Sequence, residues 1–306
     1  MPLRPPPMAG SFEPRFITVD DTPLGARLLL HHAPAQARAR GLVLYVHPFA
    51  EEMNKARRMA ALQARALAAA GLAVAQLDLL GCGDSAGDFG DASWARWVDD
   101  VVHAARWLQQ RHPARDGESA PPLWLWGLRA GTLLAVAAGA RLAEAGSACH
   151  YLFWQPAPLG KLLLQQFLRL RAAGELAAGQ AKAAMEQLRA ELAAGRAVEI
   201  AGYTLSPALC KGLEQAELKP PPAQPPGRLL WFELSAVENP RLAPAGAATL
   251  AAWQQAGWQV QAQAVQGPPF WQTTEIEDAP ALLDATARAL LAPPSAQPAA
   301  TEPAAA

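Results

Sequence analysis

The sequence predicts an α/β protein built on a mostly parallel, doubly wound sheet. Continuous apolar runs of strand length at 42–46 and 72–79 match strands that are covered on both faces. Segments with apolar residues at helical spacing follow them, at 55–70 and 93–110. Because each helical segment is twelve residues or longer, the alternation is typical of parallel βαβ units.

The remaining elements complete this architecture. Strand patterns at 16–19 and 27–31 flank a Pro23/Gly25 turn and predict an N-terminal antiparallel hairpin. Further strands are expected at 123–126, before the Gly127 turn, and at 149–154, 228–234 and 258–265, and further helices after 129 and at 242–256 and 279–291. The alternation breaks at 156–226, where helical patterns at 159–171 and 177–194 precede a Pro-rich linker. We therefore expect a core of 14–155 and 227–292, a helical lid inserted at 156–226, and a disordered tail at 293–306.

Composition narrows the class of protein. The chain has 306 residues, 51% of them hydrophobic, and a net charge of -1, which gives no overall field to attract nucleic acid or an anionic membrane. Cys82, Cys149 and Cys210 are widely spaced, so we expect reduced thiols and neither a metal nor a cofactor. The N-terminus lacks the apolar run of a signal peptide, and no run is long enough to span a bilayer. These features predict a cytoplasmic protein.

The most informative stretch lies at 123–134. An apolar strand runs into Gly127-Leu128-Arg129-Ala130-Gly131 and then into an Ala/Leu-rich helical segment. Strand, sharp turn and helix with two flanking glycines are the outline of the nucleophile elbow, G-x-S-x-G, of α/β-hydrolases. Here Arg129 occupies the serine position, and a guanidinium has no lone pair with which to attack.

Five segments extend this likeness beyond the elbow: 46–55, 81–89, 126–131, 153–156 and 269–277. On these residues the chain resembles the α/β-hydrolase superfamily and, more narrowly, the bacterial family called exosortase A system-associated hydrolase 2. The resemblance implies the α/β-hydrolase fold and a role in exopolysaccharide production and in the sorting of proteins with a C-terminal signal. It implies no particular substrate.

The histidine of the usual catalytic triad has no counterpart. The fold places that histidine after the last strand, but all six histidines of this chain lie at or before residue 150. An acid is available at the end of the 228–234 strand, at Glu233, or better after it, at Glu238. Because two of the three members are missing, the sequence argues against acyl-enzyme catalysis.

Arg129 and nearby carboxylates are the candidate catalytic groups. At a helix start, Arg129 would add its donors to free backbone N–H groups and could hold a carboxylate or phosphate. The alternative is a structural ion pair with Glu51, Glu52 or Glu238. Glu51 and Glu52 precede a helix and complement its dipole, yet one of them could act as a base.

Six further residues are candidate substrate contacts. His47 and Phe49 lie on the loop that supplies an oxyanion-hole N–H in this fold, although His47 is better explained as a brace for the strand end. Asp84 and Ser85 lie on a Gly-rich loop, where such residues usually bond to nearby backbone. Trp271 and Gln272, with Trp154 and Phe270, could form an aromatic wall for a sugar face, or could simply pack in the core.

Two hypotheses follow. The first is an atypical hydrolase or transferase that binds an anionic or glycan-related small molecule, with Arg129 as anchor and Glu51 or Glu52 activating water. The second is a pseudoenzyme that kept the fold as a binding or scaffold protein and lost the triad.

Overall fold

The computed structural model describes residues 12–173 and 178–292, which contain an eight-stranded sheet with the order β1-β2-β4-β3-β5-β6-β9-β10. The strands are β1 (Glu13–Thr18), β2 (Ala26–His32), β3 (Leu42–Val46), β4 (Ala73–Leu77), β5 (Leu123–Leu128), β6 (His150–Trp154), β9 (Arg228–Ser235) and β10 (Gln259–Gln266). β1 and β2 are antiparallel, and every pair from β4 to β10 is parallel. The predicted fold class is confirmed, including the N-terminal hairpin.

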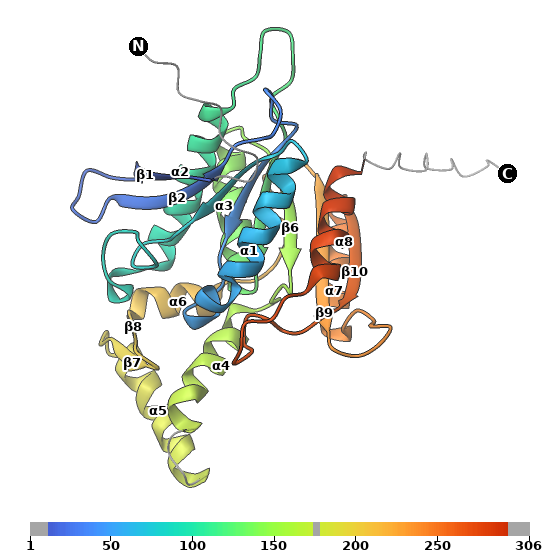
Figure 1. Cartoon of the computed structure of the whole chain (residues 1–306). Coiled ribbons are helices and arrows are strands. Elements are labelled where there is room, and N and C mark those ends of the chain that lie inside the picture. Colours follow the sequence, from blue (N-terminus) through green and yellow to red (C-terminus); the bar gives the residue numbers. More distant parts are fainter. Residues whose placement is uncertain (1–11, 174–177, 293–306) are drawn as a thin grey trace, which may run out of the picture.

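Helices cover both faces of the sheet (Figure 1). α1 (Glu51–Ala69) and α8 (Pro280–Leu291) pack on one face, and α2 (Trp94–Arg111), α3 (Ala130–Glu144) and α7 (Pro244–Gln255) pack on the other. A short 3₁₀ turn, η1 (Phe89–Asp91), precedes α2. The two-sided cover explains the apolar strands, because neither face of the sheet meets water.

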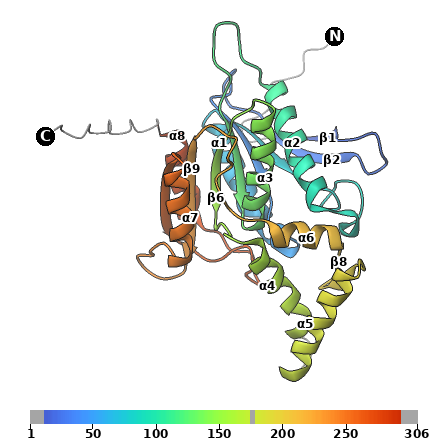
Figure 2. The same cartoon turned by 180° about the vertical axis from the view of Figure 1, so that it is seen from behind.

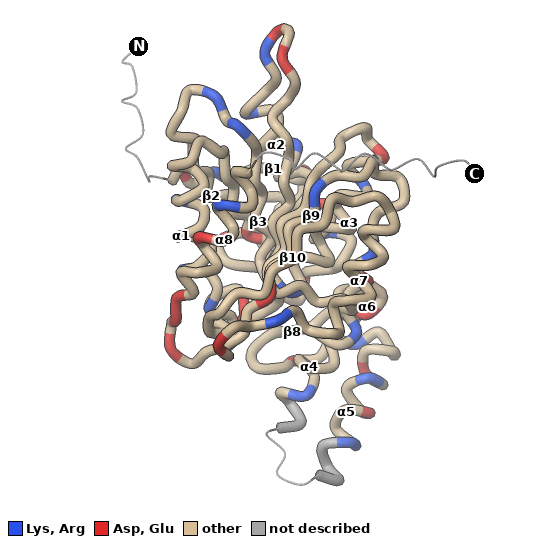
Figure 3. The backbone as a smooth tube through the Cα atoms, turned by 90° about the vertical axis from the view of Figure 1, so that its right-hand side faces the viewer, with Lys and Arg blue, Asp and Glu red and all other residues tan. Residues whose placement is uncertain are grey.

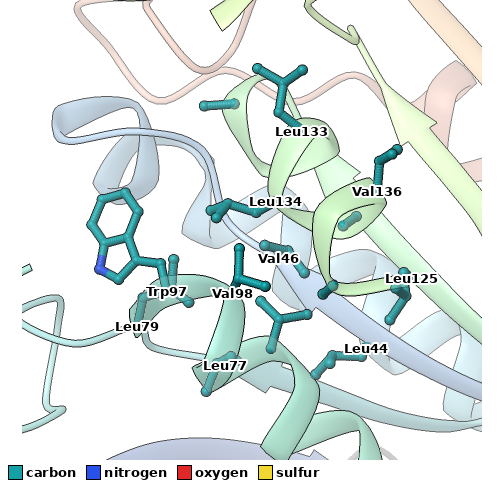
Figure 4. Close-up of a cluster of buried hydrophobic side chains, with 14 of the residues drawn as sticks. Leu44, Val46, Leu77, Leu79, Trp97, Val98, Leu125, Leu133, Leu134 and Val136 are labelled. Carbon is teal, nitrogen blue, oxygen red and sulfur yellow. The ribbon is translucent and has the colours of Figure 1, made fainter. Parts of the chain in front are cut away.

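The core lies between these layers. All five residues of β3 are buried, with Leu44 and Val46 facing α2 and α3 while Val43 and Tyr45 face α1. Figure 4 shows the first of these clusters, in which side chains of β3, β4 and β5 meet those of α2 and α3. The parallel strands are thereby fixed in register, and their carboxyl ends meet at one rim of the sheet.

The segment between β6 and β9 is more elaborate than two helices. It contains α4 (Gly160–Ala173), α5 (Ala178–Ala193), a hairpin of β7 (Val198–Ile200) and β8 (Tyr203–Leu205), and α6 (Pro207–Gln215). Ser206 caps α6 by accepting the Leu209 N–H at 3.1 Å, a start signal that the sequence analysis missed. Figure 1 shows the segment beyond the carboxyl ends of the parallel strands.

The C-terminal tail and the absence of a membrane span were the two remaining expectations. The expected disordered tail at 293–306 lies outside the described residues. Within 12–173 and 178–292, no helix is both long and apolar enough to cross a membrane.

Candidate functional site

The predicted elbow is present between β5 and α3. Arg129 has a φ of 53°, a left-handed conformation that is unusual for a residue with a side chain. A Cβ on Gly131 would lie 2.2 Å from the Val46 carbonyl oxygen, and one on Gly127 would lie 2.6 Å from the backbone of Thr132. Both glycines are therefore needed for the tight packing of α3 against the strands.

The Arg129 side chain forms an ion pair with Glu52. Its Nε and Nη2 donate to Glu52 Oε1 at 3.3 and 3.2 Å, and Nη2 also faces Gln166 Oε1 of α4 at 3.4 Å. The Arg129 Cζ lies 5.8 Å from the ring centroid of Trp271, within cation–π distance. Of the three carboxylates considered from the sequence, Glu52 is thus the partner.

The ion pair borders a cavity of about 600 Å³. Core-side residues come from the start of α1, the elbow and the loops after β6 and β10, and the opposite wall comes from α4. The lining residues are Phe49, Glu51, Glu52, Lys55, Arg129, Gln155, Leu163, Gln166, Phe167, Leu170, Trp271 and Gln272. Among the described residues, this lining includes no serine, threonine, cysteine or histidine.

The two adjacent carboxylates have different environments. Tyr203 of β8 and Asn54 donate to Glu51 Oε2 at 2.9 and 3.1 Å, which ties the hairpin to the start of α1. Burial raises the pKa of the Glu52 carboxyl, and the Arg129 charge partly offsets that effect. Glu52 Oε2 is buried and has no hydrogen-bond partner within the described part of the chain.

Two backbone N–H groups next to the cavity-lining residues have no hydrogen-bond acceptor among the described residues. Ala50, like Arg129, has a left-handed backbone, with a φ of 51°. The backbone N–H groups of Ala50 and Ala130 have no acceptor among residues 12–173 and 178–292. These are the amides of the two loops that form an oxyanion hole in α/β-hydrolases. Lys55 uses one donor, from Nζ to the Thr273 carbonyl at 2.9 Å.

Four of the candidate residues lie away from the cavity lining. His47 holds two backbone groups, with Nδ1 on the Pro48 carbonyl at 2.8 Å and Nε2 on the Leu79 N–H at 3.3 Å. Ser85 accepts the Leu28 N–H at 2.9 Å and donates to the Asp78 carbonyl, and the N–H of Asp84 donates to the side chain of Asp78. Glu238 is exposed on the loop after β9.

Glu233, Trp154 and Phe270 are buried in the protein interior and do not line the cavity. Glu233 is buried and accepts hydrogen bonds from Trp231 Nε1 and the Ala243 N–H at 2.8 and 2.6 Å. Trp154 and Phe270 are fully packed in the core with α1 and α8. Of the four residues considered for an aromatic wall, Trp271 and Gln272 line the cavity, and Trp154 and Phe270 follow the core-packing alternative.

Several cavity residues escaped the sequence analysis. Gln166, Phe167 and Leu170 come from α4, and no local pattern indicated which face of that helix meets the elbow. Phe167 contacts Phe49 with ring centroids 5.1 Å apart, so the two segments pack directly at the cavity. Lys55 in α1 and Gln155 after β6 lie in segments whose structure was predicted, but only the tertiary packing shows that their side chains line the cavity.

Comparison with solved structures defines the class of protein. Est1E of Butyrivibrio proteoclasticus, solved with ferulic acid bound, is 13% identical with a TM-score of 0.59 over 90% of this chain and 98% of that one. An α/β serine hydrolase of Xanthomonas campestris, described as without a lid, is 18% identical with a TM-score of 0.52 over 97% and 100%. A carboxyl esterase of Bacillus coagulans is 14% identical with a TM-score of 0.52 over 84% and 90%. The molecule has the α/β-hydrolase fold.

The family follows from the sequence profile of serine aminopeptidase, S33, which matches residues 37–193. The chain belongs to this family of α/β-hydrolases. No curated protein sequence matches it.

Proposed function

We propose that this α/β-hydrolase-fold protein binds an anionic amphiphile, a carboxylate or phosphate group on an apolar body, without acyl-enzyme chemistry. One observation carries the proposal. The cavity at the elbow has Arg129 in the nucleophile position, and the described residues that line it include no hydroxyl, thiol or imidazole. A cavity that keeps its donors but lacks a serine, threonine or cysteine nucleophile and an imidazole is suited to binding.

The head group is assigned to Arg129 by its unused donors. Nε and Nη2 contact Glu52 and Gln166, whereas Nη1 has no acceptor within the described part of the chain. Lys55 adds an ammonium to the cavity lining, and the open N–H groups of Ala50 and Ala130 are adjacent in sequence to the lining residues Phe49 and Arg129. An arginine with a free N–H pair can hold a second anion beside the one that it already contacts.

The apolar body is assigned to the α4 side of the cavity. Leu163, Phe167 and Leu170 line this side, and Phe49 contacts Phe167 from the opposite wall. A ligand with a chain or ring beside its charged group would bury this surface, which contributes about 25 cal/mol for each Å² removed from water. The arrangement favours an acyl chain or a hydrophobic acid over a small inorganic anion.

A second candidate is an atypical hydrolase in which Glu52 activates water. Its support is the raised pKa of Glu52 and the partnerless Oε2 beside the cavity. Glu52 would accept a proton from water while the water oxygen attacks an acyl carbon, and the Ala50 and Ala130 amides would hold the resulting oxyanion. The tetrahedral intermediate would then collapse with cleavage of the bond to the leaving alcohol, whose oxygen takes the proton from Glu52, and Arg129 would hold the carboxylate product.

The cellular setting is proposed from the resemblance described above. The five motif segments that resemble exosortase A system-associated hydrolase 2 support a role beside exopolysaccharide production and exosortase-dependent protein sorting. The three cysteines, all free, agree with the cytoplasmic location expected from the sequence.

The test is calorimetric titration with dodecanoate, with dodecanol as the uncharged match. We expect dodecanoate to bind and dodecanol to bind at least about tenfold more weakly, because a hydrogen bond to a charged group contributes about 1.5 to 3 kcal/mol. Equal affinity for the two compounds would contradict the anionic head group. Hydrolysis of p-nitrophenyl esters that is lost in E52Q would favour the second candidate, and labelling by a fluorophosphonate probe would overturn both.

A further inference from the structure

One edge of the central sheet is open to pairing. β10 is the last strand in the sheet order, and among the described residues it pairs with β9 alone. Figure 3 looks onto this edge and shows β10 between α8 and α7. These two helices cover opposite faces of this end of the sheet (Figures 1 and 2). Within β10 only Val265 is buried, so the edge of the strand is accessible.

The outward backbone groups of β10 have no partners. The Gln259 N–H donates to the Gly227 carbonyl at 2.9 Å, and the Gly267 N–H donates to the Ser235 carbonyl at 3.0 Å. Because backbone groups alternate in direction along a strand, the odd-numbered residues of β10 face β9 and the even-numbered residues face away from the sheet. No described residue bonds to the outward N–H and C=O groups. They belong to Val260, Ala262, Ala264 and Gln266.

This edge lacks the usual protection against pairing. The strand at the opposite edge, β1, contains Glu13, Pro14 and Arg15, and charged residues and prolines of this kind block the pairing of exposed edges. β10 has no charged residue and no proline, and its register with β9 is continuous over all eight residues. An uncharged, regular edge of this length is a template for another strand.

The uncharged surface extends beyond the strand. Residues 242–274, which include α7 and β10, contain no Asp, Glu, Lys, Arg or His, although 17% of the whole chain is charged. The cores of protein interfaces are depleted in charged residues. On the other side of β10, α8 carries Asp284 and Arg288, whose charges are opposite and add no net repulsion. The surface around β10 therefore favours a protein partner over a charged ligand.

We propose that a second copy of this chain pairs with β10, antiparallel about a two-fold axis at Gln263, so that the two sheets join into one. The outward residues lie symmetrically about Gln263. Val260 of one copy meets Gln266 of the other, and Ala262 meets Ala264, so every outward N–H donates to a carbonyl of the other copy. The net charge of -1 gives little repulsion between copies. A two-fold pair is closed, so assembly stops at the dimer.

The test is sedimentation equilibrium of the full chain and of charge variants at the axis. Gln263 is exposed and lies opposite its own counterpart, so Q263K places two like charges together. We expect the wild type to dimerise at micromolar concentrations, and Q263K and Q263E each to raise the dissociation constant at least about threefold. An equimolar mixture of Q263K and Q263E should recover the dimer, because opposite charges then meet. Q110K is the matched control, since Gln110 is exposed on α2, and it should dimerise as the wild type does.

A backbone variant tests the hydrogen bonds themselves. A262P removes one outward N–H from each copy and leaves the groups that face β9 in place, as an edge strand allows. We expect it to raise the dissociation constant at least about tenfold.

Four results would overturn the inference. The first is a wild type that stays monomeric at micromolar concentrations. The second is a dimer with the same dissociation constant in the wild type, Q263K and A262P, since it would then use another surface. The third is failure of the Q263K and Q263E mixture to recover the dimer, which would contradict the axis at Gln263. The fourth is a monomer in which the Val260 and Ala262 amides are protected from hydrogen exchange, because another segment of the same chain would then cover the edge.

Discussion

Arg129 lies 3.2 Å from Glu52, and this ion pair stands where an α/β-hydrolase of the usual kind presents its nucleophile. Both side chains are largely buried, with 16 and 24% exposure. The pair closes the core side of the cavity and leaves donors of Arg129 and one oxygen of Glu52 without partners among the described residues. The turn between β5 and α3 thus holds a charged contact at the cavity.

Restoring the serine should not restore a hydrolase. In R129S, the hydroxyl would take the elbow position, but the described cavity lining has no imidazole to accept its proton. We expect no fluorophosphonate labelling of R129S and dodecanoate binding at least about tenfold weaker than in the wild type, because the charged donor is lost. Mass spectrometry of the probe-treated protein measures the first effect. Labelling of the introduced hydroxyl in R129S would show that a base is present after all.

Gly131 should be indispensable for stability. In G131A, the added Cβ would meet the Val46 carbonyl oxygen at 2.2 Å, so α3 has to move away from β3. We expect the free energy of unfolding to fall by about 2 to 3 kcal/mol, as for an overpacked core. G90A is the control, because its Cβ would lie 3.2 Å from the Thr204 side chain and 3.9 Å from the nearest backbone atom, the Thr204 carbonyl oxygen. Urea unfolding that gives equal losses for the two variants would contradict the close packing of the elbow.

His150 should make the fold sensitive to acid. Burial, followed by the Arg228 charge, lowers the pKa of His150 to about 4, and its Nδ1 accepts the Arg228 N–H at 3.1 Å. A pKa below the unfolded value of about 6.5 means that unfolding takes up a proton, so stability should be full above pH 6.5 and fall toward pH 4.

H150N is the variant for this test, because its side-chain oxygen can still accept the Arg228 N–H but does not titrate in this range. Urea unfolding between pH 4 and 7 should show a smaller loss in H150N than in the wild type. The remaining loss is assigned to His31, whose pKa burial lowers to about 4, and to His32, His47 and His112, whose pKa values burial also lowers. A wild-type stability that stays constant over this range would contradict the assignment.

Local sequence patterns were sufficient to predict the strands of the central sheet, most of its covering helices and the turn at Arg129. Apolar runs predicted the buried strands, the helical pattern at 55–70 predicted most of α1, and the two glycines around Arg129 indicated a sharp turn that the structure contains. These features depend on chain geometry over a few residues. The same reasoning also anticipated that His47 would brace a strand end, which agrees with its two backbone contacts.

The contacts of the site could not be predicted in this way. Glu51, Glu52 and Glu238 were equivalent partners for Arg129 on the sequence, and only the packing of α1 against the elbow selects Glu52. The Gln166 contact depends on which face of α4 meets the rim, which no local pattern indicates. Aromatic residues were equally ambiguous, since Trp154 is in the core while Trp271 lines the cavity.

The most direct test of the account is dodecanoate affinity in R129Q and E52Q, measured by calorimetry between pH 5 and 8. R129Q removes the charged donor and should weaken binding at least about tenfold. E52Q removes the competing negative charge and should strengthen binding about fivefold. Because burial raises the Glu52 pKa, wild-type affinity should rise as the pH falls and this carboxyl gains a proton, whereas E52Q should lose that dependence. Equal affinities in the wild type, R129Q and E52Q at every pH would contradict the assignment of the Arg129–Glu52 pair as the ligand anchor.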